Sequence, residues 1–163
     1  MFNVGDNVIY GNTGICIIED IRLEDFLGKK ETYYILRPLQ SKGSMIFCPV
    51  NNVKVTMRKV ITKEELDRIL TFHNCPTVSW IENDHERRDC FSAILKRCDT
   101  AELSATLRLL YKRKDELSDT NKKLHASDEK ALADCERILF GEISHILSIS
   151  IEEAADMFKS KIK

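Results

Sequence analysis

The feature that most constrains the fold of this chain is a run of β-branched residues, interrupted by glycines, near its start. Residues 4–21 read VGDNVIYGNTGICIIEDI. In a strand, Val8 and Tyr10 face one side and Ile9 the other. The glycines of residues 11–14 tolerate positive φ and supply a chain reversal. The pattern predicts a small, strongly bent antiparallel sheet. Because the segment contains no nucleophile–base pair, we interpret it as a module that makes contacts rather than one that catalyses a reaction.

More strand signals follow within the first sixty residues. Residues 22–32 are polar and include Gly28, which indicates a loop or a hairpin end. Residues 33–39 predict the next strand, ended by a proline, and residues 44–50 another. Residues 53–57 predict a short last strand. This number of short strands in so short a segment predicts a Tudor-like or SH3-like small β-barrel.

The remainder of the chain has a helical period, beginning at residue 63. We therefore predict a boundary at residues 58–62, with a β domain at residues 1–60 and a helical domain at residues 61–163. The fold class is α+β: a Tudor-like/SH3-like small β-barrel followed by an all-α bundle of about five helices. The predicted helix starts are Thr62 with a capping box to Glu65, a helix at residues 84–97, a cap at Asp99 or Thr100, a cap at Ser127, and a last helix from Ser150.

Composition excludes several classes of function. The chain has 163 residues, 43% apolar and 31% charged, with a net charge of −1. These values are typical of a folded soluble protein. The net charge is too small to attract nucleic acid or a membrane surface to the protein as a whole. No apolar run approaches the length of a membrane span, and the first residues lack the pattern of a signal peptide. We expect a cytoplasmic protein with no membrane partner.

Residues that carry chemistry do not cluster in the sequence. Six cysteines in a reducing compartment favour buried thiols over disulfides. His73 and Cys75 form the only close His/Cys pair, whereas a zinc site needs about four ligands. His85 and His145 have no serine or cysteine partner at usable spacing. We expect no enzyme activity, no metal, no cofactor and no small-molecule substrate.

Several motifs, in order, match one known family. The motifs are residues 2–10 (FNVGDNVIY), 14–16 (GIC), 33–36 (YYIL), 48–50 (CPV), 57–61 (MRKVI), Trp80, 107–114 (LRLLYKRK), 127–130 (SDEK) and 138–143 (ILFGEI). Together they resemble the CarD/CdnL family of bacterial RNA polymerase-binding transcription regulators over essentially the whole chain. The same β module begins the polymerase-contacting region of the transcription–repair coupling factor.

The resemblance implies a division of roles between the two domains. It implies a Tudor-like domain that docks on the RNA polymerase β subunit. It also implies a helical domain placed on promoter DNA at the upstream edge of the transcription bubble. In the family a tryptophan wedges into the minor groove and helps keep the bubble open, and Trp80 stands at that position. No reaction is catalysed, and the expected function is stabilisation of the open complex.

Docking is expected to use an exposed strand edge that extends a sheet of the partner. Where family members place arginines, this chain has Glu24 and Phe47. We therefore predict an apolar contact through Phe26 and Phe47 in place of charge pairing, and the alternative is that both belong to the barrel core. The candidate polymerase-binding residues are Arg22, Glu24, Phe26, Ile46 and Phe47.

The helical domain carries little positive charge for a DNA-contacting domain. Residues 63–163 hold 17 Lys and Arg against 20 Asp and Glu, and only residues 108–123 are locally basic. Because affinity for a duplex scales with the phosphates neutralised, we expect weak, non-sequence-specific and polymerase-dependent binding of promoter DNA. The alternative is an adaptor whose helical domain binds another protein and buries Trp80. The candidate DNA-binding residues are Trp80, Arg87, Arg88, Lys112, Arg113, Lys114, Lys122 and Lys123.

Overall fold

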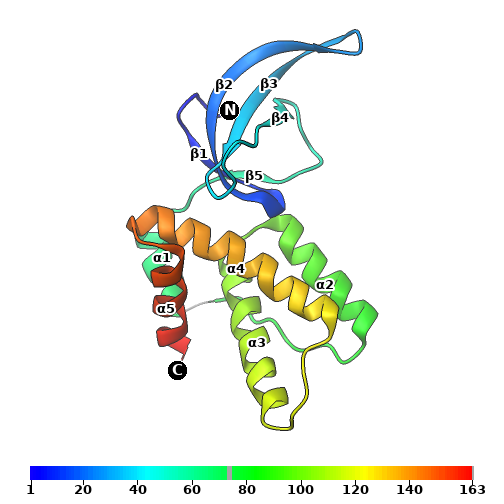
Figure 1. Cartoon of the computed structure of the whole chain (residues 1–163), viewed down its shortest axis with the longest axis vertical. Helices are drawn as coiled ribbons and strands as arrows, with labels where there is room; N and C mark the ends of the chain where they lie inside the picture. Colours follow the sequence, from blue (N-terminus) through cyan, green and yellow to red (C-terminus); the bar gives the residue numbers. More distant parts are fainter. Residues whose placement is uncertain (73–74, 163) are drawn as a thin grey trace.

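A five-stranded antiparallel sheet precedes five helices in the computed structural model, which describes residues 1–72 and 75–162 (Figure 1). The predicted α+β class is confirmed. The sheet order is β4-β3-β2-β1-β5, so β4 and β5 are its edges and the barrel-like sheet is open rather than closed. The strands are β1 (Asn7–Tyr10), β2 (Gly14–Phe26), β3 (Lys29–Pro38), β4 (Ile46–Pro49) and β5 (Met57–Lys59).

The β2–β3 hairpin is longer than the sequence predicted. Residues 22–32, expected as a loop or hairpin end, continue both strands and leave only Leu27 and Gly28 as the turn. Their φ angles are 55° and 81°. A two-residue turn with both φ positive matches the right-handed twist of the flanking strands, which explains why pairing persists to the end. Figure 1 shows this hairpin extending beyond the other strands.

The strands β1 and β2 are buried on both faces. Val8 and Cys16 lie opposite each other and face the interior of the sheet, whereas Ile9 and Ile15, the next pair, face the helices. This alternation follows from the period of two in a strand. The small cluster inside the sheet consists of Val8, Cys16, Ile18, Tyr34, Leu36 and Cys48.

The helices begin where capping residues satisfy their first backbone N–H groups. The predicted capping box of Thr62 and Glu65 is confirmed, as is the cap by Asp99. The prediction for Ser127 is wrong, because His125 is the capping residue and accepts from the Ser127 N–H. The helices are α1 (Lys63–Leu70), α2 (Asp84–Arg97), α3 (Thr100–Ser118), α4 (Ala126–Leu147) and α5 (Ile151–Ile162).

The longest helix, α4, crosses directly beneath the sheet and carries much of the main core (Figure 1). Ile138, Leu139 and Ile143 of α4 are fully buried with residues of α3 and with Phe158 of α5. In the part of the chain that the structure describes, no helix combines the length and the apolar character needed to cross a membrane.

The thiols lie mainly in the cores, as predicted. Cys16, Cys48, Cys98 and Cys135 are buried, Cys75 and Cys90 are half-buried, and all six are free. His73, which the sequence places near Cys75, lies outside the described residues.

Candidate functional site

Three aromatic rings from neighbouring strands form a cluster on the outer face of the sheet. The Phe26 ring packs edge-on against Tyr33, with 5.1 Å between centroids, and against Phe47, at 5.6 Å. Phe26 and Phe47 remain 45% and 40% exposed. Neither belongs to the buried cores, so the alternative of barrel-core residues does not describe them. We call Phe26, Tyr33 and Phe47 the aromatic cluster.

Strand register explains which candidate docking residues share this face. Arg22 lies opposite Tyr33, and Glu24 and Phe26 follow at a spacing of two. Phe47 lies on the neighbouring edge strand β4. Ile46 is the exception, because the alternation turns it to the other face, where it packs against the small cluster.

The charge on this face is largely paired within the chain. Arg22 forms ion pairs with Glu24, at 2.5 Å, and with Asp20, at 3.6 Å. A single arginine flanked by two carboxylates presents no net positive charge. The face therefore offers exposed rings and an unpaired strand edge rather than a basic patch, which fits an apolar contact better than charge pairing.

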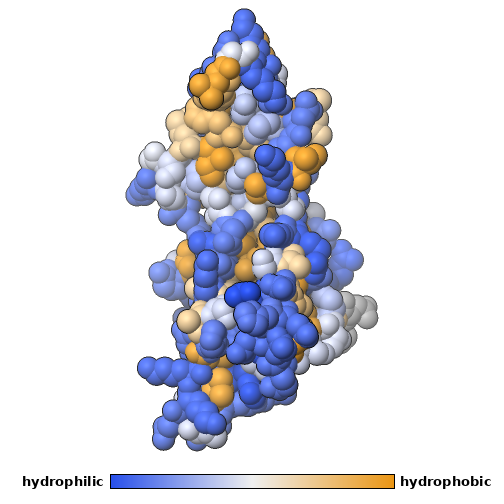
Figure 2. All heavy atoms as spheres, turned by 90° about the vertical axis from the view of Figure 1, so that its right-hand side faces the viewer, coloured by the Kyte–Doolittle hydropathy of each residue, from blue (hydrophilic) through white to orange (hydrophobic). Residues whose placement is uncertain are grey.

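More apolar side chains are exposed toward the tip of the β2–β3 hairpin. Leu23 is 64% exposed on the face opposite the aromatic cluster, and Leu27 in the turn is fully exposed. Figure 2 shows hydrophobic side chains gathered on the upper, sheet-bearing half of the molecule, close to this tip.

Trp80 lies in the segment that leads into α2 and is half-buried against the main core. Two guanidinium groups contact its ring. Arg87 lies 4.2 Å from the ring centroid and Arg113 lies 5.1 Å from it. The ring is thus held by cation–π contacts while part of it stays accessible.

Arg87, predicted to contact phosphate, is only 3% exposed. Its guanidinium donates to both carboxylate oxygens of Asp128, at 3.0 and 2.8 Å, to Asp84 at 2.6 Å, and to the carbonyl of Ile81 at 2.7 Å. The hydrogen bonds to Asp128 raise the pKa of Arg87, and Arg87 in turn lowers the pKa of the Asp84 carboxyl. The burial and these partners make Arg87 a support for Trp80 and remove it from the set of phosphate contacts.

The other basic candidates are spread over three segments. Arg88 on α2 is exposed beside His85, and Arg113 on α3 is half-buried with an ion pair to Glu116. The structure therefore brings only Arg87 and Arg113 to the tryptophan. The remaining lysine candidates are exposed on α3 or in the loop after it, and they are Lys112, Lys114, Lys122 and Lys123.

Two residues of these surfaces were missed by sequence reasoning. Tyr33 was read only as part of a strand, and its place in the aromatic cluster depends on the register of β3 against β2. Asp128 was read within an α4 motif, yet it is 1% exposed and fixes Arg87. For Asp128 an acidic residue at a helix start was the only local signal.

Comparison with known proteins gives a family for the sheet-bearing part. Residues 2–61 match the family described as "CarD-like/TRCF RID domain". The chain is also 26% identical over 155 residues, which is 92% of this chain and 95% of the relative, to the Bacillus subtilis (strain 168) protein named "Putative transcription factor YdeB". The resemblance to the CarD/CdnL family is confirmed, and the match to the CarD-like/TRCF RID domain covers the β module.

Proposed function

We propose that this protein is a transcription regulator that docks on the β subunit of RNA polymerase and contacts promoter DNA at the upstream edge of the bubble, where it stabilises the open complex. The observation that carries the proposal is the exposed aromatic cluster on the outer face of a CarD-like/TRCF RID domain. Aromatic residues are enriched in protein interfaces, and the neighbouring edge strand β4 is open to extension by a partner strand.

The energetics favour docking through the rings. Full burial of a phenylalanine side chain stabilises by about 1.5–3 kcal/mol, and Phe26 and Phe47 each still expose nearly half of that surface. Backbone hydrogen bonds along β4 would fix the register of the complex. Arg22, already paired with Glu24, adds orientation rather than much affinity.

A pair of charge substitutions on opposite faces of the hairpin region tests this docking. Phe47→Arg is expected to abolish pull-down of the purified β subunit. Leu23→Arg places the same charge at an exposed apolar site on the opposite face, and it is expected to leave binding intact. Circular dichroism confirms that both variants are folded. Unchanged binding by folded Phe47→Arg contradicts the proposal.

The helical domain would approach DNA through the accessible part of Trp80. An apolar wedge needs a large flat side chain on a rigid support, and Arg87 and Arg113 supply that support. The exposed phosphate contacts would be Arg88, Lys112, Lys114, Lys122 and Lys123. Because the domain has more acidic than basic residues, docking on the polymerase must supply the local DNA concentration.

Fluorescence of Trp80, the sole tryptophan, tests the DNA contact. We expect quenching by fork-junction DNA only when polymerase is present. A Trp80→Phe variant serves as the control for signals from the polymerase. Tight binding of promoter DNA by the isolated protein at physiological salt contradicts the proposed dependence on polymerase.

A second candidate function is that of a protein-binding adaptor. The observation that favours it is the packing of Trp80 against the main core, together with the loss of Arg87 as a phosphate contact. On this alternative, fork-junction DNA leaves Trp80 fluorescence unchanged even in the polymerase complex, while Phe47→Arg still abolishes docking.

A further inference from the structure

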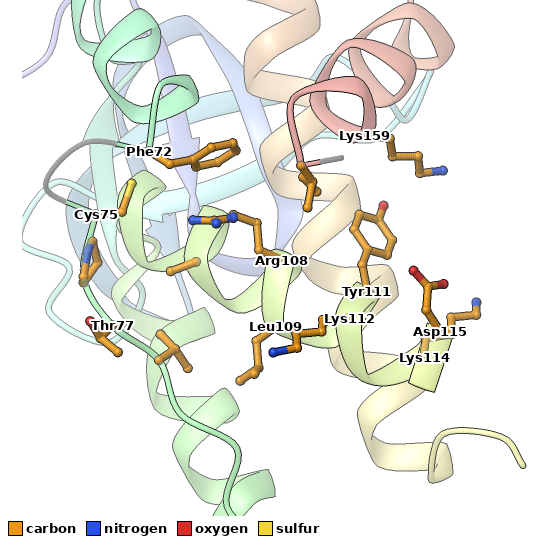
Figure 3. A pocket seen from close by; sticks show the side chains of 14 residues that line it. Phe72, Cys75, Thr77, Arg108, Leu109, Tyr111, Lys112, Lys114, Asp115 and Lys159 are labelled. Atoms are coloured by element: carbon orange, nitrogen blue, oxygen red, sulfur yellow. The ribbon is translucent and has the colours of Figure 1, made fainter. Parts of the chain in front are cut away.

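We propose that a groove between α3, α5 and residues 75–78 binds a small organic phosphate of the nucleotide class. The groove has a volume of about 850 Å³, within the range of roughly 300–1,000 Å³ that small-molecule sites occupy. This inference goes beyond docking on polymerase and contact with DNA, and it depends on neither. Figure 3 shows the side chains that line the groove, with Arg108 near its centre.

Arg108 is the residue that points to a ligand. Among the arginines of the described residues, it is the one whose side chain forms no hydrogen bond or ion pair with another described residue. Its Nε atom is buried and has no partner within residues 1–72 and 75–162. The outer Nη groups of the same guanidinium line the groove, and an incoming oxyanion can accept hydrogen bonds from them.

The guanidinium of Arg108 is also held in place. It lies 4.0 Å from the centroid of the Phe72 ring, and Figure 3 shows it directed toward Phe72 and Cys75. Stacking on a ring fixes the plane of the donor fork, and such a fork matches the oxygens of a phosphate in bidentate geometry. Arg108 is thus preorganised for an oxyanion before any ligand arrives.

The charge around the groove is positive although the chain as a whole carries −1. Lys112, Lys114 and Lys159 line the groove with Arg108, and Asp115 is the one acidic residue among the lining residues. The charge of Arg108 reaches the Cys75 end, where it partly offsets the rise in the pKa of that thiol caused by burial. Several cations around a concave surface attract a multiply charged anion.

The apolar residues that line the groove favour an organic phosphate over inorganic phosphate as the ligand. Val78, Leu109 and Ile162 add apolar surface, and the Tyr111 ring faces Lys159 at 5.5 Å. Inorganic phosphate would leave this surface unused, whereas the base and ribose of a nucleotide cover it. Lys112 and Lys114 also belong to the proposed contacts with promoter DNA. Free duplex is nevertheless a poorer occupant in the absence of polymerase, because a duplex also meets the acidic residues that outnumber the basic ones in residues 63–163.

Binding is tested on the full chain with ATP, GTP, AMP and GMP, with inorganic phosphate and adenosine as partial probes. Equilibrium dialysis gives the affinities, and the rate of Cys75 alkylation reports occupancy of the groove. We expect at least one nucleotide to bind and to slow alkylation of Cys75, with half-buried Cys90, which does not line the groove, as the internal control. Adenosine is expected to do neither, and inorganic phosphate to bind more weakly than the nucleotide.

Variants of Arg108 test whether this residue binds the nucleotide. Arg108→Gln is expected to weaken nucleotide binding about tenfold or more, since a charge-assisted bidentate pair is lost. Arg108→Lys keeps the charge without the fork and is expected to lose part of the affinity. Arg97→Gln, which changes an exposed arginine away from the groove, is expected to bind as the unchanged chain does. Circular dichroism of each variant shows whether it is folded.

Three results overturn the proposal. The first is an absence of binding by all four nucleotides up to about 1 mM, the weak end of specific affinities. The second is nucleotide binding that Arg108→Gln and Arg108→Lys both leave unchanged. The third is a short DNA duplex that protects Cys75 at lower concentration than any nucleotide, which would identify DNA as the source of the phosphate.

Discussion

Arg58 of β5 and Glu142 of α4 form a bidentate ion pair, with Nη1–Oε1 and Nη2–Oε2 distances of 2.7 and 2.9 Å, that joins the sheet to the helices. Glu142 is fully buried and also accepts from the backbone N–H of Ile61 and from the Thr100 hydroxyl. Arg58 donates in addition to the carbonyl of Cys98, at the end of α2. One carboxylate and one guanidinium therefore fix the sheet against three helical segments.

Replacing Glu142 by Ala is expected to destabilise the protein by about 3–5 kcal/mol, because Arg58 and two further donors lose their acceptor in a buried site. Urea unfolding measures the change. The bidentate pair of Arg97 and Glu102 provides a matched control, since it has similar geometry at the surface. Glu102→Ala is expected to change stability little. Equal losses in both variants contradict the role of burial.

Replacing Arg87 by Met is expected to cost about 3–5 kcal/mol, because Asp128 is then left buried without its counter-charge. The emission of Trp80 is expected to shift as the ring loses the guanidinium 4.2 Å from its centroid. Arg88→Met is the control, since this neighbouring arginine is exposed and a surface change costs roughly 0.5 kcal/mol or less. A stable Arg87→Met with unchanged emission contradicts the supporting role.

Replacing Leu27 by Asn is expected to stabilise the hairpin by about 0.5–1 kcal/mol, because Asn tolerates positive φ better than Leu does. Leu27 has φ of 55° and is fully exposed, so its removal loses no packing. Chemical unfolding measures the gain. Leu23→Asn, at an exposed strand position of the same hairpin, is the control and is expected to bring no gain. A destabilised Leu27→Asn would show that the turn holds Leu27 for another reason.

The stability of the protein is expected to fall as pH rises above 9. Burial raises the pKa of Cys16 to about 11 from an ordinary 9.0, so the folded state keeps the neutral thiol while the unfolded chain ionises. The stabilisation is complete below pH 9 and is lost between pH 9 and 11, by up to about 3 kcal/mol. Unfolding in urea at several pH values gives the slope. Burial also raises the pKa of the Cys135 thiol to about 12, so Cys16→Ala is expected to reduce that slope rather than remove it. An unchanged slope contradicts the assignment.

The predictions from sequence succeeded where local interactions determine structure. The capping box of Thr62 and Glu65 and the helix at residues 84–97 were located because caps and apolar periods act within a few residues. The start of α4 was misplaced, because a histidine took the capping role expected of Ser127. The β2–β3 hairpin was judged too short, because its polar strands pair through backbone groups that leave no apolar pattern.

The candidate surfaces were predicted only in part. Phe26 and Phe47 were predicted as an apolar docking contact, with barrel core as the alternative. The structure exposes both rings, whereas their contact with each other and the third ring, Tyr33, required the strand register. Arg87 was interpreted as a surface cation, because its hydrogen-bond partner Asp128 lies 41 residues away in the sequence and no neighbouring residue indicates that contact.

The sequence by itself determined a β module followed by a helical bundle, because the hydrophobic period, the turns and the helix caps each depend on residues that are close together in the chain. Tertiary structure alone decided which charges are paired and which are free. Arg58 finds Glu142 across 84 residues and is buried with it, whereas Arg108 stacks on Phe72 with no acceptor for its buried Nε among the residues described. The physical reason is that the state of a charged side chain depends on desolvation and on its nearest acceptor, and both are set by packing between distant segments.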